Sequence, residues 1–208
     1  MKITEPQKTL KLGRPLSFDR EAALGRAMHL FWAHGYEATS IADLTAAMGI
    51  TPPSLYAAYG DKKRLFLESV DHYRTGTGAG TAASDQMIDA AETAADAARQ
   101  MLDGSALHFT GSDTPPGCLL ATGAISCSAA AADVQTALAA IRHRTEVRLR
   151  DKIIADMASG LISPDIDADI LAAYIMAVIQ GMSTLARDGA PRKKLQSLAT
   201  AVMRGWPA

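Results

Sequence analysis

Apolar residues recur every three or four positions along most of the chain, and no stretch of useful length alternates with period two. The first spacing puts side chains on one face of an α-helix, whereas the second is typical of a strand. The pattern therefore predicts an all-α protein of about nine to ten helices. Helices are expected over residues 19–34, 41–48, 52–59, 61–73, 84–104, 117–128, 133–159, 167–188 and 192–205.

Signals for helix ends are densest between residues 40 and 60. Ser40 precedes a helical pattern and is followed three positions later by Asp43, as in a capping box. Gly49 ends that helix, and Thr51 starts the next one ahead of two prolines, which the first turn of a helix tolerates. Two short helices joined through a glycine are typical of a helix-turn-helix, whose second helix enters the DNA major groove.

The sequence around this motif resembles the N-terminal domain of the tetracycline-repressor (TetR) family. The family usually has phenylalanine where Tyr59 stands and alanine where Thr45 stands, and it often has a basic residue and a glycine at Pro52 and Pro53. The matching pieces are Gly35-Tyr36, Thr39-Ser40-Ile41, Leu44, Met48-Gly49-Ile50, Leu55-Tyr56-x-x-Tyr59, Lys62 and Leu65-Phe66.

The resemblance implies a division of the chain that agrees with the distribution of charge. Residues 1–74 hold 10 Lys/Arg and 8 Asp/Glu, a balance of +2, whereas residues 75–208 hold 11 and 14, a balance of −3. The net charge of −1 therefore combines a basic N-terminal part with an acidic remainder. The parts expected are a basic arm over 1–16, a DNA-binding domain over 17–74 with its motif at 40–59, and an effector-binding and dimerisation domain over 84–208.

The resemblance also implies which residues contact double-stranded DNA. The helix expected over residues 52–59 would read the bases. It has no Arg, Asn or Gln to make bidentate contacts, so hydroxyl groups, thymine methyl groups and DNA shape should dominate the recognition of sequence. Arg14 in the arm is expected in the minor groove, with a solvated tail as the alternative. Phosphate contacts are expected from Thr39 or Ser40, from Tyr56 and from Lys62, and base contacts from Thr51, Pro52, Pro53, Ser54 and Tyr59.

Composition excludes several other classes of protein. The chain has 40 alanines and only 5% aromatic residues, which favours helices, and 21% charged residues, which argues against disorder. The longest uninterrupted apolar stretch is residues 170–179, about half of a membrane span, and no secretory signal follows Met1. We therefore expect a cytoplasmic protein without a membrane partner.

In the family, the last two helices form a homodimer and a small apolar effector sits among the core helices. Ordinary core packing is the alternative for every residue assigned to these two roles. The dimer is expected from Ile175, Val178, Ile179, Met182, Leu195, Leu198 and Val202. Candidate walls of the effector pocket are Met87, Met101, Leu102, His108, Phe109, Cys118, Leu119, Thr122, Ser126, Tyr174 and Met176.

Three other functions stay open from the sequence. Cys118 and Cys127 could place DNA binding under thiol or metal control, although nine residues of helix would put them on opposite faces and no histidine has ligand spacing with them. A regulator without an effector is the second alternative. An enzyme is the third, but no catalytic or cofactor-binding motif occurs. We therefore expect no enzyme activity, no cofactor and no metal site.

Overall fold

The computed structural model describes residues 18–76, 81–125 and 127–207, and all regular structure in these ranges is helical. The predicted all-α class is therefore confirmed. Ten α-helices are present there, together with a short 3₁₀ helix over Ala129–Ala131. The α-helices are α1 (Arg20–His34), α2 (Ile41–Met48), α3 (Pro52–Tyr59), α4 (Lys62–Thr75), α5 (Thr81–Ala90), α6 (Ala94–His108), α7 (Leu119–Thr122), α8 (Ala132–Ala158), α9 (Ala168–Arg187) and α10 (Arg192–Arg204).

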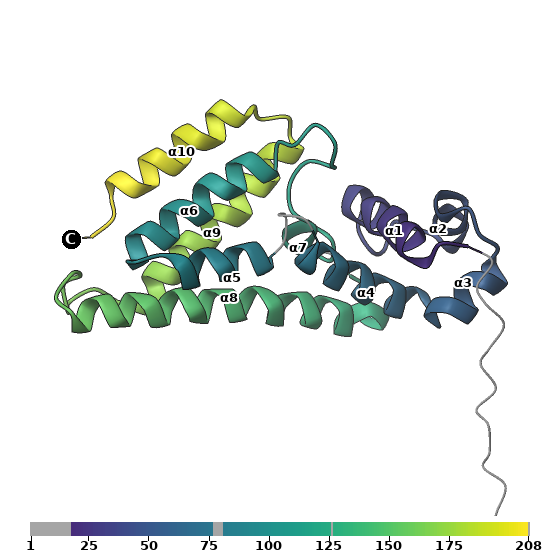
Figure 1. The fold of residues 1–208 in the computed structure, drawn as a ribbon, viewed down its shortest axis with the longest axis horizontal. Coiled ribbons are helices and arrows are strands. Elements are labelled where there is room, and N and C mark those ends of the chain that lie inside the picture. The colour runs from purple at the N-terminus through teal and green to yellow at the C-terminus, as the bar shows by residue number, and fades with distance from the viewer. Residues whose placement is uncertain (1–17, 77–80, 126, 208) are drawn as a thin grey trace, which may run out of the picture.

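The helices form a head and a body that meet along α4, α7 and α8 (Figure 1). The head holds α1 to α3 and most of α4, and the body holds α5, α6, α9 and α10. Helix α8 runs along one side of the molecule, from the far end of the body to the side of α4. Helix α7 lies between the two parts, so it is placed to pass a change in one of them to the other.

Caps explain why most helices begin where the sequence predicts. Thr51 accepts a hydrogen bond from the backbone N–H of the third residue after it, and Asp19, Asp61, Thr93 and Asp167 do the same for their helices. Such side chains satisfy donors that the first turn of a helix leaves free. These signals are local in the sequence, so they can be recognised without knowing the fold.

The single helix predicted over residues 84–104 is wrong. Helix α5 ends at Ala90, and α6 begins at Ala94 after a three-residue break. Thr93 caps α6, and the buried carboxylate of Asp156 on α8 accepts the Ala94 N–H at 2.7 Å. A carboxylate at a helix N-terminus is favoured by the free N–H groups and by the helix dipole. The partner is 62 residues away, which is why periodicity alone missed the break.

The helix predicted over residues 117–128 is also wrong, because among the described residues of this range only Leu119–Thr122 is α-helical. Backbone carbonyls on either side of this short helix accept hydrogen bonds from the head instead. The indole N–H of Trp32 donates to the Gly117 carbonyl at 3.2 Å, and the Tyr36 N–H donates to the Gly123 carbonyl at 2.8 Å. The argument that placed two cysteines on opposite faces of this helix therefore fails, although both thiols are free.

Two buried clusters form the core. The head cluster is aromatic and includes Phe31, Trp32 and Phe66, and it extends onto α7 and the first turns of α8. The body cluster consists mainly of alanine, methionine and branched aliphatic side chains from α5, α6, α8, α9 and α10. Helix α9 is long and apolar enough to span a membrane by length and composition, but here it packs in the body core. The half-buried side chain of Cys118 contacts both clusters, so it marks their junction.

Candidate nucleic-acid interface and ligand pocket

Helices α2 and α3 make the tight turn that a helix-turn-helix requires. Gly49 ends α2 in the left-handed conformation with φ +68°, and the Ile50 N–H then donates to the Thr45 carbonyl. A Cβ at Gly49 would meet no other atom within 4 Å, so the backbone angle, rather than crowding, favours glycine at this position. Leu55 is fully buried and fixes α3 against the head.

The first turn of α3 is exposed and carries small groups. Thr51, Pro52 and Pro53 are exposed, and the hydroxyl groups of Thr51 and Ser54 lie 2.9 Å apart in a mutual hydrogen bond. Tyr56 follows one turn later with 49% of its surface accessible. This surface offers hydroxyl groups and proline carbons but no guanidinium or amide, so it suits contacts to phosphates, thymine methyl groups and groove shape.

Lys62 lies at the start of α4 beside the ring of Tyr36. Its ammonium is 4.4 Å from the ring centroid and also donates weakly to the Glu37 carbonyl at 3.5 Å. Burial lowers the pKa of Lys62. The Glu37 carboxylate accepts hydrogen bonds from the backbone and hydroxyl of Ser128. The aromatic ring therefore holds a cation at the start of α4, and no carboxylate among the described residues pairs directly with it.

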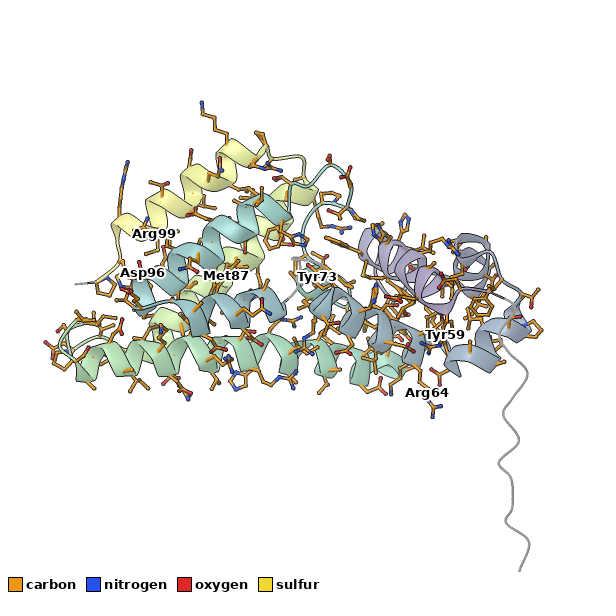
Figure 2. The ribbon with its side chains drawn as sticks, viewed as in Figure 1. Tyr59, Arg64, Tyr73, Met87, Asp96 and Arg99 are labelled. Atoms are coloured by element: carbon orange, nitrogen blue, oxygen red, sulfur yellow. The ribbon has the colours of Figure 1, made fainter. Side chains whose placement is uncertain are left out.

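A small cavity lies inside the body. It has a volume of about 70 Å³ and lies between α5, α6, α7, α8 and α9. Its walls are mainly apolar, and Met87, labelled in Figure 2, comes from α5 on one side. The lining residues also include the polar side chains Ser84, Ser105, His108, Cys118, Arg142, Thr145 and Gln180.

The end of this cavity nearest the head touches α4 through a chain of side chains. The Tyr73 hydroxyl lies 3.1 Å from Nε2 of His108 and 3.4 Å from Sγ of Cys118, and Figure 2 shows Tyr73 where α4 meets the body. Burial lowers the pKa of His108 to about 4, so its imidazole is neutral at pH 7. The Trp32 ring of α1 packs on both partners, with centroids 4.9 Å from Tyr73 and 5.2 Å from His108. The cavity wall therefore continues directly into the core of the head.

Comparison with known proteins identifies both parts of the chain. The family model for bacterial regulatory proteins of the tetR family matches residues 23–69, and a tetracyclin repressor-like C-terminal domain matches residues 86–202. The chain belongs to the tetR family. It is therefore a transcriptional regulator and not an enzyme, as predicted.

Relatives of this TetR-family chain match it over nearly its full length. The HTH-type transcriptional repressor ComR of Escherichia coli K12 is 38% identical over 94% of this chain and 92% of its own length. The repressor BdcR of the same organism is 30% identical over 98% and 95%. A solved structure of the TetR-family regulator CifR, a cysteine mutant in complex with 26-bp operator DNA, has 36% identity and a TM-score of 0.86, covering 93% of this chain and all of the other.

The head of this TetR-family chain exposes most of the side chains predicted to contact DNA, but two of those predictions are corrected. Thr39 is 1% exposed and its hydroxyl donates to the Gly35 carbonyl, so Ser40 alone is presented at the start of α2. Tyr59 is 4% exposed and donates to the Arg20 carbonyl at 2.8 Å. Helical spacing alone does not show that the Thr39 hydroxyl faces inward and the Ser40 hydroxyl faces solvent. Arg14 lies outside the described residues.

The cavity contains about half of its predicted lining. Met87, Met101, His108, Phe109, Cys118 and Met176 line it. Leu102 and Leu119 lie in the core instead, and Thr122 donates to the Cys118 carbonyl of its own helix. Tyr174 is 49% exposed on the outside of α9, and Ser126 lies outside the described residues. The prediction missed Arg142 and Gln180, whose only signal in the sequence is a position on a helix of unknown orientation.

The residues predicted for the dimer are divided between core and surface. Ile175, Met182 and Leu195 are fully buried and Val202 is nearly so, so a second subunit cannot reach them. Val178, Ile179 and Leu198 are half-buried. The exposed large apolar residues of α9 are Ile170 and Tyr174, at 67% and 49% accessibility. The apolar stripe of α9 covers more than one face, and the sequence did not tell which face lies outward.

Proposed function

We propose that this chain is a repressor that binds a pseudo-palindromic operator as a homodimer and leaves it when a small, largely apolar effector enters the body cavity. The exposed first turn of α3, on a head that belongs to the tetR family, carries this proposal. The full-length similarity to the repressor ComR supports repression, and the similarity to CifR, whose solved structure contains operator DNA, supports the DNA partner. The cavity supports both the presence of an effector and its largely apolar character.

On the DNA, Thr51, Pro52, Pro53 and Ser54 would lie against base edges. These side chains carry hydroxyl groups and apolar carbons, which supports a readout that depends on thymine methyl groups and groove shape. Phosphate contacts would come from Ser40, Tyr56 and Lys62, with Arg14 in the minor groove.

The dimer would form through the exposed face of α9, with α10 beside it. Residues 170, 174, 177, 181 and 184 of α9 are exposed and follow one another at intervals of three or four. This spacing gives a continuous face that combines the large Ile170 and Tyr174 with small residues, which allows two helices to pack closely. A dimer is also what places two reading helices about one DNA turn apart. A charge at Tyr174 (Tyr174→Arg) should shift the protein towards monomer in analytical ultracentrifugation.

The DNA-binding proposal is tested by a gel shift with the DNA that flanks the chain's own gene. The wild-type protein should retard a fragment of this DNA and protect a pseudo-palindrome in a footprint. Tyr56→Ala should weaken binding several-fold, whereas Leu107→Ala, which removes an exposed side chain of the body, should not. Failure of the wild-type protein to select any sequence, either from these flanks or from genomic fragments, would contradict the proposal.

Control by thiols or metal is less well supported than control by an effector. Burial raises the pKa of the Cys118 thiol, which disfavours the reactive thiolate. No group of three His, Cys, Asp or Glu side chains in the described ranges could hold a metal ion. The double variant Cys118→Ala, Cys127→Ala should therefore retain normal release from DNA. A protein that binds chromosomal DNA in a bacterium acts in the cytoplasm, and we place this chain there.

A further inference from the structure

The described residues that line the body cavity include one cation and no carboxylate. Arg142 from α8 is the charged member of its lining, because His108 is neutral and the remaining lining residues are uncharged. Most of the cavity surface is apolar, so little polar surface is left to solvate an ion. The apolar lining residues include Met87, Met101, Phe109, Met176 and Ile179. The guanidinium is therefore the charged group that a ligand in this mostly apolar space would contact.

Among the described residues, Arg142 has no acidic partner, in contrast to Arg148 and Arg150 further along the same helix. Arg148 pairs with Asp85 and Asp89, and Arg150 pairs with Asp151 and Asp169. Arg142 is half-buried and donates from Nη1 to the Leu120 carbonyl, with no carboxylate in ion-pair range in the described part of the chain. A guanidinium has five N–H donors in a fork, so several remain available for an oxyanion.

Polar groups beside the arginine suit the same kind of ligand. The side-chain amide of Gln180 and the hydroxyl of Ser105 line the cavity with Arg142. The Gln180 amide donates only to the carbonyl one turn back on its own helix, at a long 3.3 Å. The cavity volume of about 70 Å³ admits a compact molecule, and the flexible methionines can move to enlarge it.

We infer that the effector is a small organic acid, with a compact apolar body among the methionines and an ionised carboxylate or similar oxyanion on Arg142. This inference rests on the proposed ligand-controlled function, and it narrows the effector from an apolar molecule to an amphipathic anion. A neutral apolar compound would leave the half-buried guanidinium without a counter-charge, whereas an acid would neutralise it.

The same arginine connects the ligand to the head. Its bond to the Leu120 carbonyl holds α7, and the backbone on either side of α7 accepts hydrogen bonds from Trp32 and Tyr36 of the head. An oxyanion that draws the guanidinium towards the cavity competes with the Leu120 carbonyl for its N–H groups. Ligand binding would thereby loosen the turn on which α1 rests and change the position of the reading helix.

The test measures direct binding of matched acids and amides to the full-length protein without DNA. The probes are benzoate and hexanoate, each compared with benzamide and hexanamide by isothermal titration calorimetry at pH 7. Wild-type protein should bind each acid at least about tenfold more tightly than its amide, because a charge-assisted bidentate contact exceeds a neutral one by that factor. Arg142→Gln should reduce this preference to about twofold or less. The control variant, Arg144→Gln, removes an exposed charge from the same helix and should keep the full preference.

Four results would each overturn the inference. In wild-type protein they are an amide that binds as well as its acid does, and no binding of either acid. In the variants they are an acid preference that survives in Arg142→Gln, and one that disappears equally in Arg144→Gln. A gel shift without ligand distinguishes failure of the organic-acid inference from failure of the proposed repressor function. Protein that binds its operator but no acid loses only the present inference, and protein that binds acid but no DNA loses the proposed repressor role.

Discussion

The head and the body are built from different side chains. Of the 11 aromatic residues in the chain, eight lie between residues 18 and 73, and six of the nine methionines lie beyond that range. In the head, Phe66 packs edge-on against Phe31 and Tyr36, with ring centroids 5.0 and 5.1 Å away. In the body, alanines let the helices approach closely and methionines fill the remaining space. Rings have few rotamers and methionine has many, so the head is suited to hold one geometry and the body to adapt.

The largest expected difference between the two regions comes from removing a ring of the head. Phe66→Ala should lower the free energy of unfolding by about 3–5 kcal/mol, because a fully buried ring leaves a cavity that rigid neighbours cannot fill. Urea denaturation of the dimer at fixed protein concentration measures this change. Met176→Ala in the body should cost less, since flexible neighbours can close the space. An equal loss in both variants would contradict the contrast between stiff and adaptable cores.

A pair of glycine substitutions tests the same contrast by adding one methyl group to each region. A Cβ at Gly123 would lie 2.6 Å from the Leu119 carbonyl oxygen, a backbone atom beside the head. A Cβ at Gly104 would lie 2.7 Å from Cε of Met87, the free end of a flexible side chain. Gly123→Ala should therefore cost about 1–3 kcal/mol, and Gly104→Ala less than about 1 kcal/mol while reducing the cavity. Thermal unfolding and effector binding of both variants measure these effects, and a larger loss for Gly104→Ala would reverse the comparison.

The junction between head and body should respond to acid through His108. Its pKa in the folded protein is about 4, below the ordinary value of 6.5 expected when unfolded. The unfolded state therefore binds the extra proton between these values, and stability falls as pH drops from about 6.5 to about 4. The slope from this one group is at most about 1.4 kcal/mol per pH unit. His108→Gln should flatten the curve of stability against pH, measured by urea denaturation at a series of pH values.

The smallest expected effect concerns the exposed face of α3, which is proposed to contact DNA. Tyr56→Phe removes one exposed hydroxyl from α3 and should weaken operator binding by about 1 kcal/mol or less, with no change in stability. Fluorescence anisotropy on operator DNA at fixed salt measures it. If Tyr56 contacts phosphate, the loss should be similar for all DNA sequences. A loss restricted to one operator variant would instead assign Tyr56 to base reading.

The sequence was most informative where structure depends on nearby residues. Capping side chains, the glycine at the turn and apolar spacing predicted α1 to α4 and α8 to α10 closely, because each signal acts within one or two helical turns. It was wrong at residues 91–93 and at residues 123–125 and 127–128, where Asp156 and the head supply partners from 62 and more residues away. For the candidate site, the motif predicted DNA contacts from Thr51, Pro52 and Pro53, which are exposed and whose contacts stay a prediction, but it assigned Thr39 and Tyr59 outward although both face the core.

By itself, the sequence determined that the chain is helical and that a helix-turn-helix stands near its N-terminus. Periodicity, caps and turns depend on short segments of sequence, so they change little with how those segments pack. The tertiary structure decided which face of α9 lies outward, which residues line the cavity and that Arg142 lies in its wall with no acidic partner among the described residues. These properties depend on helices that meet from distant parts of the chain, so hydrophobic spacing shows that a residue is buried but not what it is buried against.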